Sequence, residues 1–191
     1  MCRSLLTGTA FLAAFLLFGC GQTPLKSMYQ LRNVDPLSTS PTALRLAIAL
    51  PQGFRVDASQ VEFTARLAKT PTTPAQSHRL RLRPASNDAA MQRLRSTLPP
   101  KTMLYAFELH PDAVKTFSDL RPKVLIDKRE GSLSVKTTAC RETAGPIQSL
   151  NATIYIKTAE LDTYVPLLKN IDLLQDTPPE DFAVAVPMCA R

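Results

Sequence analysis

The chain has 191 residues, of which 23 are lysine or arginine and 16 are aspartate or glutamate, so its net charge is +7 at neutral pH. This length suits one domain with a real hydrophobic core rather than two domains. A basic surface favours acidic partners, although a surface of mixed charge is more typical of a protein that only needs to stay soluble.

An apolar run from Leu5 to Phe18 follows one early basic residue, Arg3, and ends before Gly19 and Cys20. A charged start, a short apolar stretch and a small residue, in this order, are typical of a secretory signal. The run has about 14 residues, fewer than the roughly 20 that a membrane-spanning helix needs.

The last residues of this segment, Leu17-Phe18-Gly19-Cys20, resemble the lipobox at which bacterial lipoproteins are lipidated and cleaved. Leu17 and Gly19 match the pattern, whereas Phe18 departs from it because a smaller side chain is usual there. The resemblance implies a signal peptide over residues 1–19 and a lipid anchor on Cys20. A plain cleaved signal and an uncleaved membrane helix are the alternatives.

Residue 21 bears on the location of the mature chain. In enterobacterial lipoproteins an Asp after the lipidated cysteine retains the protein in the inner membrane, so Gly21 implies the outer membrane, with the body in the periplasm. Three acyl chains exceed the roughly two lipid signals that stable anchoring requires. Export also removes the protein from nucleic acid, which we therefore do not expect as a partner.

The cysteines divide by position. With Cys2 in the signal and Cys20 lipidated, Cys140 and Cys189 remain in an oxidising compartment and are predicted to form a disulfide. A reactive or metal-binding thiol is the alternative, but a metal site needs further Cys or His at ligand spacing. The chain has two histidines, so we expect no metal and no cofactor.

Residues 20–42 are predicted to be a lipidated tether, because several prolines and a Ser-Thr-Ser run interrupt any regular period. Residues 43–191 are then expected to form a single domain. Apolar and polar residues alternate in several runs of this domain, as is typical of half-buried strands. These runs cover residues 43–50, 61–67, 77–83, 102–109 and 150–157.

Three further segments complete the expected secondary structure. Residues 123–139 are predicted to form a hairpin with its tip at 128–131, and residues 182–186 a last strand before Cys189. Residues 163–175 fit either one helical face or an edge strand.

Two short helices are expected between the strands. Asn87 is predicted to cap one that ends before Pro99, and Pro111 to open another that ends before Pro122. Many strands separated by turns favour a mainly β fold, an antiparallel β-sandwich that is immunoglobulin-like or related, with two short helices.

The most distinctive feature of the predicted surface is a row of arginines. Arg79, Arg81 and Arg83 alternate within residues 77–83, so one strand face would carry three guanidinium groups about 7 Å apart. Such a face is a candidate contact for anionic lipid or lipopolysaccharide. A solvated outer face, or an edge strand charged against aggregation, explains the same pattern.

The sequence offers little for catalysis. It contains no Gly-x-Ser-x-Gly elbow, Gly-rich phosphate loop or His-Glu-x-x-His zinc helix, and His78 and His110 do not form a recognisable site with the scattered carboxylates. Tyr155 and Tyr164 are either interface anchors or packed against neighbouring strands.

We therefore expect a non-enzymatic lipoprotein that acts as an accessory or interaction module in the cell envelope, with an envelope protein as its partner. The alternative function is binding of a lipid or small molecule in a cavity between the sheets, in support of transport. A carrier of this kind should contain an apolar cavity, which distinguishes it from an interaction module.

Overall fold

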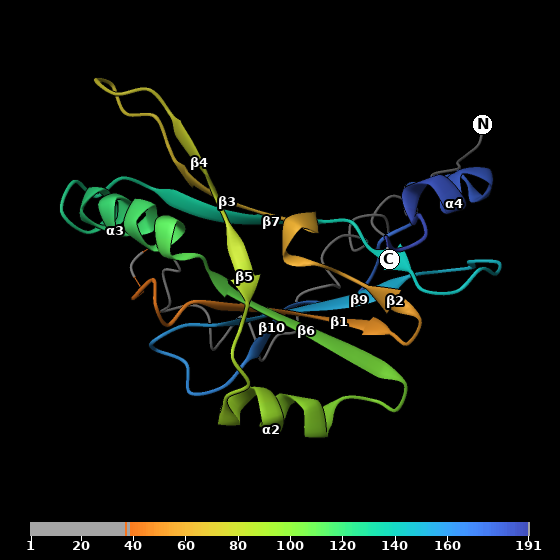
Figure 1. Cartoon of the computed structure of the whole chain (residues 1–191). Coiled ribbons are helices and arrows are strands. Elements are labelled where there is room, and N and C mark those ends of the chain that lie inside the picture. The colour runs from red at the N-terminus through yellow and green to blue at the C-terminus, as the bar shows by residue number, and fades with distance from the viewer. Residues whose placement is uncertain (1–36, 38, 191) are drawn as a thin grey trace, which may run out of the picture.

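A computed structural model describes residue 37 and residues 39–190. The fold is mainly antiparallel β, as predicted, and its two larger sheets pack face to face (Figure 1). The first sheet has five strands in the order β10-β9-β1-β6-β5. These are β1 (Arg45–Pro51), β5 (Leu82–Pro84), β6 (Thr102–Leu109), β9 (Asn151–Lys157) and β10 (Val165–Asp172).

The second sheet has three strands in the order β4-β3-β7, namely β3 (Val61–Leu67), β4 (Gln76–Leu80) and β7 (Gly131–Thr137). A short pair joins β2 (Phe54–Arg55) to β8 (Cys140–Arg141). The helices of the described residues are α2 (Ala89–Thr97), α3 (Pro111–Leu125) and α4 (Phe182–Ala185), with 3₁₀ turns η1 (Ala58–Gln60) and η2 (Pro179–Asp181). Within this part of the chain, no helix is long and apolar enough to cross a membrane.

The main core lies between the two larger sheets. Leu46, Ile48 and Leu50 of β1 project from one face, and with Ile154 of β9 they join a buried cluster that includes Val61 of β3. This is the face that the period-two pattern of residues 43–50 predicts, because alternate residues of a strand point the same way.

The opposite face of the five-stranded sheet is covered by α2 (Figure 1). Ala47, Ala49 and Ala106 form most of the strand surface there, and these small side chains allow the helix to pack closely with Met91 and Leu94. Both faces of β1 are therefore covered, and residues 46–50 are all buried.

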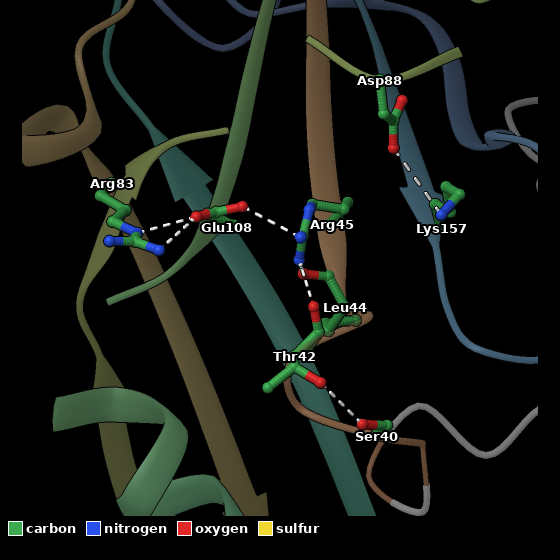
Figure 2. Close-up of polar contacts among 8 residues, drawn as sticks. All are labelled: Ser40, Thr42, Leu44, Arg45, Arg83, Asp88, Glu108 and Lys157. Atoms are coloured by element: carbon green, nitrogen blue, oxygen red, sulfur yellow. Dashed lines mark hydrogen bonds and ion pairs between the residues drawn. The ribbon is translucent and has the colours of Figure 1, made fainter. Parts of the chain in front are cut away.

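The start of α2 differs by one residue from the prediction. Asp88, rather than Asn87, is the N-cap, and its side chain accepts a hydrogen bond from the Met91 backbone N–H at 2.7 Å. A second oxygen of Asp88 lies 3.9 Å from Lys157 Nζ, which links the helix to β9 (Figure 2). The end before Pro99 is as predicted, with Leu98 as the C-cap.

The predicted hairpin over residues 123–139 is wrong in its first half. The helix α3 continues through Pro122 to Leu125, and β7 pairs with β3 instead of with the preceding residues. Phe117, Leu120 and Val124 recur at helical spacing and are all buried. Their burial offsets the cost of a proline inside a helix, which is about 3 kcal/mol.

The run over residues 77–83 forms two strands rather than one. The chain leaves the three-stranded sheet after Leu80 and joins the five-stranded sheet at Leu82, with Arg81 between the strands. The Arg81 carbonyl accepts a hydrogen bond from the His110 N–H at 2.9 Å, which fixes this crossing. Pro84 sits in an edge strand, where its missing N–H leaves no gap in a ladder.

Two C-terminal segments also take a definite form. Residues 163–175 contain the edge strand β10 rather than a helix. Residues 182–186 do not form the predicted strand, because the short helix α4 occupies 182–185. After it, the chain makes an isolated parallel bridge between Met188 and Arg141, which brings Cys189 beside Cys140.

The described residues of the predicted tether belong to the packed body. Leu37 and Thr39 are both fully buried, and Thr39 Oγ1 accepts a hydrogen bond from the Ala159 N–H at 3.0 Å. Packing of the domain therefore extends at least six residues N-terminal of the expected boundary at residue 43.

Candidate functional site

An apolar cleft of about 360 Å³ opens between the two larger sheets. Apart from Ser134, all of its lining residues are apolar: Leu46, Phe63, Leu133, Val135, Ile154, Ile156, Leu167 and Leu168. Ordinary voids in protein interiors rarely exceed the size of a water molecule, whereas small-ligand pockets span roughly 300–1,000 Å³. The cleft therefore has the size and lining of a site for an apolar ligand.

The cleft lies where both sheets end. Leu133 and Val135 come from β7, the edge strand of the three-stranded sheet, and Leu167 and Leu168 come from β10, the edge strand of the five-stranded sheet. No further strand joins either edge in the described part of the chain. The two sheets thus leave one side of their shared core open.

An irregularity in β10 shapes its wall. The pairing of β10 with β9 shifts register on both sides of Leu168, and Asn170 adopts a left-handed conformation with φ of 53°. The Asn170 N–H donates to Thr153 Oγ1 at 3.2 Å, in place of a regular ladder bond. Because a bulge interrupts the alternation of side chains, the successive residues Leu167 and Leu168 both line the cleft.

The three arginines of the predicted row are separated. Arg79 is exposed on β4 of the three-stranded sheet, whereas Arg83 lies on β5 of the five-stranded sheet and binds Glu108, with Nη2 2.6 Å from the carboxylate. Arg81, between these strands, lies 3.5 Å from Asp112. The row thus does not share one strand face, and two of its members already have carboxylate partners.

Glu108 also binds a second arginine. Figure 2 shows its carboxylate between Arg83 and Arg45, with Arg45 Nη2 at 3.0 Å. Only 11 % of the Glu108 side chain is exposed, so its charge is satisfied largely by these two guanidinium groups. This contact holds the edge strand β5 and the central strand β1 to β6, and its role is therefore structural.

The predicted disulfide is confirmed. The Cys140 and Cys189 sulfur atoms are 2.05 Å apart, and the Cα atoms are separated by 4.9 Å. The backbone around the bond is also fixed, since the Cys189 N–H donates to the Arg141 carbonyl at 2.9 Å. The C-terminal segment is thus tied covalently to the body at β8.

The two histidines lie apart. His78 is on β4, and its Nε2 is buried without a hydrogen-bond partner among the described residues. His110 is the N-cap of α3, and its Nδ1 accepts a hydrogen bond from the Asp112 N–H at 3.4 Å. Among the described residues, no group of three or more His, Cys, Asp or Glu side chains is placed to hold a metal.

The two tyrosines considered as interface anchors pack on the α2 side of the five-stranded sheet, away from the cleft. Tyr164 is buried, and burial, helped by the nearby Asp88 carboxylate, raises its pKa to about 12. Burial also raises the pKa of Tyr155, which is half-buried. Both side chains thus contribute mainly to packing.

Sequence reasoning missed two features. The cleft has no local signal, because its residues belong to five separate strands. The second is Arg129, which the sequence places at the hairpin tip 128–131 but which is only 8 % exposed. The predicted lipidation site, Cys20, lies outside the described residues.

No protein-family model matches this sequence, and comparisons with curated proteins and with solved structures found no significant match.

Proposed function

We propose that this protein is an outer-membrane lipoprotein that serves as a non-enzymatic binding module of the bacterial envelope, and that its body holds an apolar chain of a lipid. The observation that carries the proposal is the cleft between β7 and β10. Burial of an acyl chain against its walls contributes about 25 cal/mol for each Å² of apolar surface. A polar ligand would lose its hydrogen bonds to water there with almost no replacement.

The cleft favours this function over that of a pure interaction module. A partner protein binds to a surface and does not require an open gap in the core, whereas a lipid carrier requires an apolar space that shields the chain from water. Anchored at Cys20, such a body would stay near the membrane surface where lipids enter and leave. This arrangement suits a role in support of lipid transport.

The lipid anchor is tested by the intact mass of the full-length protein expressed in a bacterium and recovered from the membrane fraction. The expected mass is that of residues 20–191 with three acyl chains, and the variant Cys20→Ala should lack it. A product that is soluble, unlipidated and cut elsewhere would remove the anchor and the membrane location with it.

The cleft is tested separately, by growth of the producing cells with a fatty acid that carries a photoreactive diazirine and an alkyne. Irradiation should attach label within β7 and β10, as mapped by mass spectrometry of peptides from the purified protein. Label in the anchor does not depend on irradiation and is therefore distinguishable.

A pair of matched variants makes this test specific. Leu133→Phe and Leu167→Phe enlarge half-buried side chains that line the cleft, and each should reduce the light-dependent label several-fold. Met103→Phe enlarges a side chain that is 44 % exposed and outside the lining, so it should change nothing. Equal labelling of all three variants would contradict the proposal.

A further inference from the structure

A second concavity, of about 440 Å³, lies at the far end of the three-stranded sheet. Its wall is formed by the end of β3, the turn between β3 and β4, and the start of β7. Arg66 and Ser132 pair directly across β3 and β7 and therefore project from the same outer face. Lys69 and Glu130 complete the charged lining. We call this concavity the basic bowl.

The wall of the basic bowl is held by Arg129. Its guanidinium donates hydrogen bonds to the carbonyls of Ala68 at 2.7 Å and Pro74 at 3.1 Å, at the two ends of the β3–β4 turn. The Ala68 N–H in turn donates to the Glu130 carbonyl at 2.8 Å. The turn is thus fixed before any ligand arrives, and a fixed site loses less entropy on binding.

The charges around the bowl are out of balance. Arg66 and Lys69 line the bowl together with a single carboxylate, Glu130, whereas Arg129 is buried against the β3–β4 turn that forms its wall. Within the described residues, none of these four side chains forms an ion pair. Arg129 is the most unusual of them, because it is 92 % buried and its Nε has no hydrogen-bond partner in the described part of the chain. A buried cation without a compensating anion is destabilising.

We propose that the basic bowl binds a phosphate group carried on a small molecule or a lipid headgroup. The lining holds two cations and one carboxylate, and the buried Arg129 beside the wall adds a third cation, so the charges in and next to the bowl sum to +2. A phosphate monoester carries about −1.5 to −2 at neutral pH. An arginine fork and a lysine can contact different oxygens of one tetrahedral group, with the Ser132 hydroxyl as a further donor. The volume of the bowl leaves room for a group of sugar size beside the phosphate.

This proposal does not depend on the apolar cleft. Ser132 lines the bowl and the next residue, Leu133, lines the cleft, so both sites lie along β7. The phosphate of a membrane lipid is therefore one source of the ligand, and a soluble sugar phosphate is the other.

The test uses the full-length protein purified from membranes into nanodiscs that contain only phosphatidylcholine. Isothermal titration with glucose 1-phosphate and with soluble dihexanoyl phosphatidic acid measures the two sources. Dihexanoyl phosphatidylcholine, whose phosphate is masked by choline, is the negative control. Binding of either phosphate monoester supports the proposal and identifies the source, and binding of neither overturns it.

Three variants assign any binding to the bowl. Arg66→Gln with Lys69→Gln should weaken it about tenfold or more, because two charged contacts are lost, and Glu130→Gln should strengthen it by removing the opposing charge. Arg79→Gln removes an exposed cation of the same sheet face outside the bowl and should leave binding unchanged.

The exposed positions of Arg66, Lys69 and Glu130 allow these variants to fold, which circular dichroism verifies. An equal loss in Arg79→Gln and in the double variant would show a general charge effect and overturn the assignment. Leu133→Phe, which narrows the cleft, should leave glucose 1-phosphate binding intact, so that failure of one site is not mistaken for failure of the other.

Discussion

The side chain of Leu37 occupies the space that a side chain at residue 131 would need. A Cβ atom built on Gly131 would overlap Leu37 Cδ1, and Leu37 is fully buried in the cluster that also contains Phe117 and Leu120. A side chain at residue 131 therefore requires the buried Leu37 side chain to move. The contact joins the N-terminal part of the described chain to the strand that borders both candidate sites.

We accordingly expect Gly131→Ala to destabilise the protein by about 1–3 kcal/mol, as overpacking of a filled core does. Urea unfolding followed by circular dichroism measures the change. Gly145→Ala is the matched control, because nothing lies within 4 Å of a Cβ atom at residue 145. Equal stability of the two variants would show that Leu37 moves aside freely.

Loss of the disulfide should lower stability substantially. The bond between Cys140 and Cys189 spans 49 residues, and the chain-entropy model gives about 4 kcal/mol for a loop of this length. The variant with both cysteines changed to serine should unfold at a lower urea concentration than the wild type. Its midpoint should also be unaffected by a reducing agent that lowers the wild-type midpoint. If the reducing agent leaves the wild-type urea midpoint unchanged, the disulfide does not stabilise the fold and the prediction is wrong.

Replacement of the carboxylate between two arginines should also be costly. Glu108→Gln leaves Arg45 and Arg83 without their shared anion at a position where the side chain is 11 % exposed. We expect a loss of about 1–3 kcal/mol in the free energy of unfolding.

The control for this prediction is Asp119→Asn. It removes an exposed i,i+4 pair with Lys115 on α3, and such pairs contribute about 0.3–0.5 kcal/mol. Thermal unfolding of both variants gives the comparison, and a smaller effect at residue 108 than at residue 119 would contradict the structural role assigned to Glu108.

The buried Tyr164 predicts a loss of stability at high pH. Its pKa rises to about 12 in the folded protein, against about 10 in an unfolded chain. The folded state therefore retains the proton more tightly. This contribution to stability is fully present below pH 10 and is lost as the pH rises from about 10 to about 12.

Titration of tyrosine absorbance near 295 nm should show a late step in the wild type, and Tyr164→Phe should lack it. The stability of this variant should also fall less steeply than that of the wild type between pH 10 and 12. A late step that persists in Tyr164→Phe would assign the high pKa to another tyrosine.

Local patterns predicted much of the secondary structure because the alternation of apolar and polar residues along a strand involves only neighbouring residues. Residues 61–67 and 102–109 form β3 and β6 as predicted, and in β3 the alternate residues Val61, Phe63, Ala65 and Leu67 are the buried ones. In β6 the alternation is lost, because Leu104 and Ala106 are buried under α2 while Met103 is exposed. The predictions failed where distant packing opposed a local signal. Pro122 indicated the end of a helix, yet burial of Val124 against the core carries α3 past it.

The arginine row shows the same limit in the candidate sites. Period-two spacing assigned Arg79 and Arg83 to one strand face, but it carries no information on whether a strand continues or crosses to another sheet. The crossing at Arg81 depends on a hydrogen bond with His110, which is 29 residues away in sequence. The sequence likewise placed Arg129 at an exposed hairpin tip, because nothing near it in sequence indicates its hydrogen bond to the Ala68 carbonyl of the β3–β4 turn.

The sequence by itself determined that this protein is a mainly β body and that Cys140 pairs with Cys189, since periodicity and cysteine count are properties of the chain alone. The motif Leu17-Phe18-Gly19-Cys20, from which a lipid anchor is expected, is likewise read from the sequence alone. Only the tertiary structure decided which strands are neighbours and which edges stay open. The apolar cleft forms because β7 and β10 are edge strands of two different sheets, and the wall of the basic bowl is held by the buried Arg129. Both sites depend on contacts between segments far apart in sequence, which no local pattern encodes.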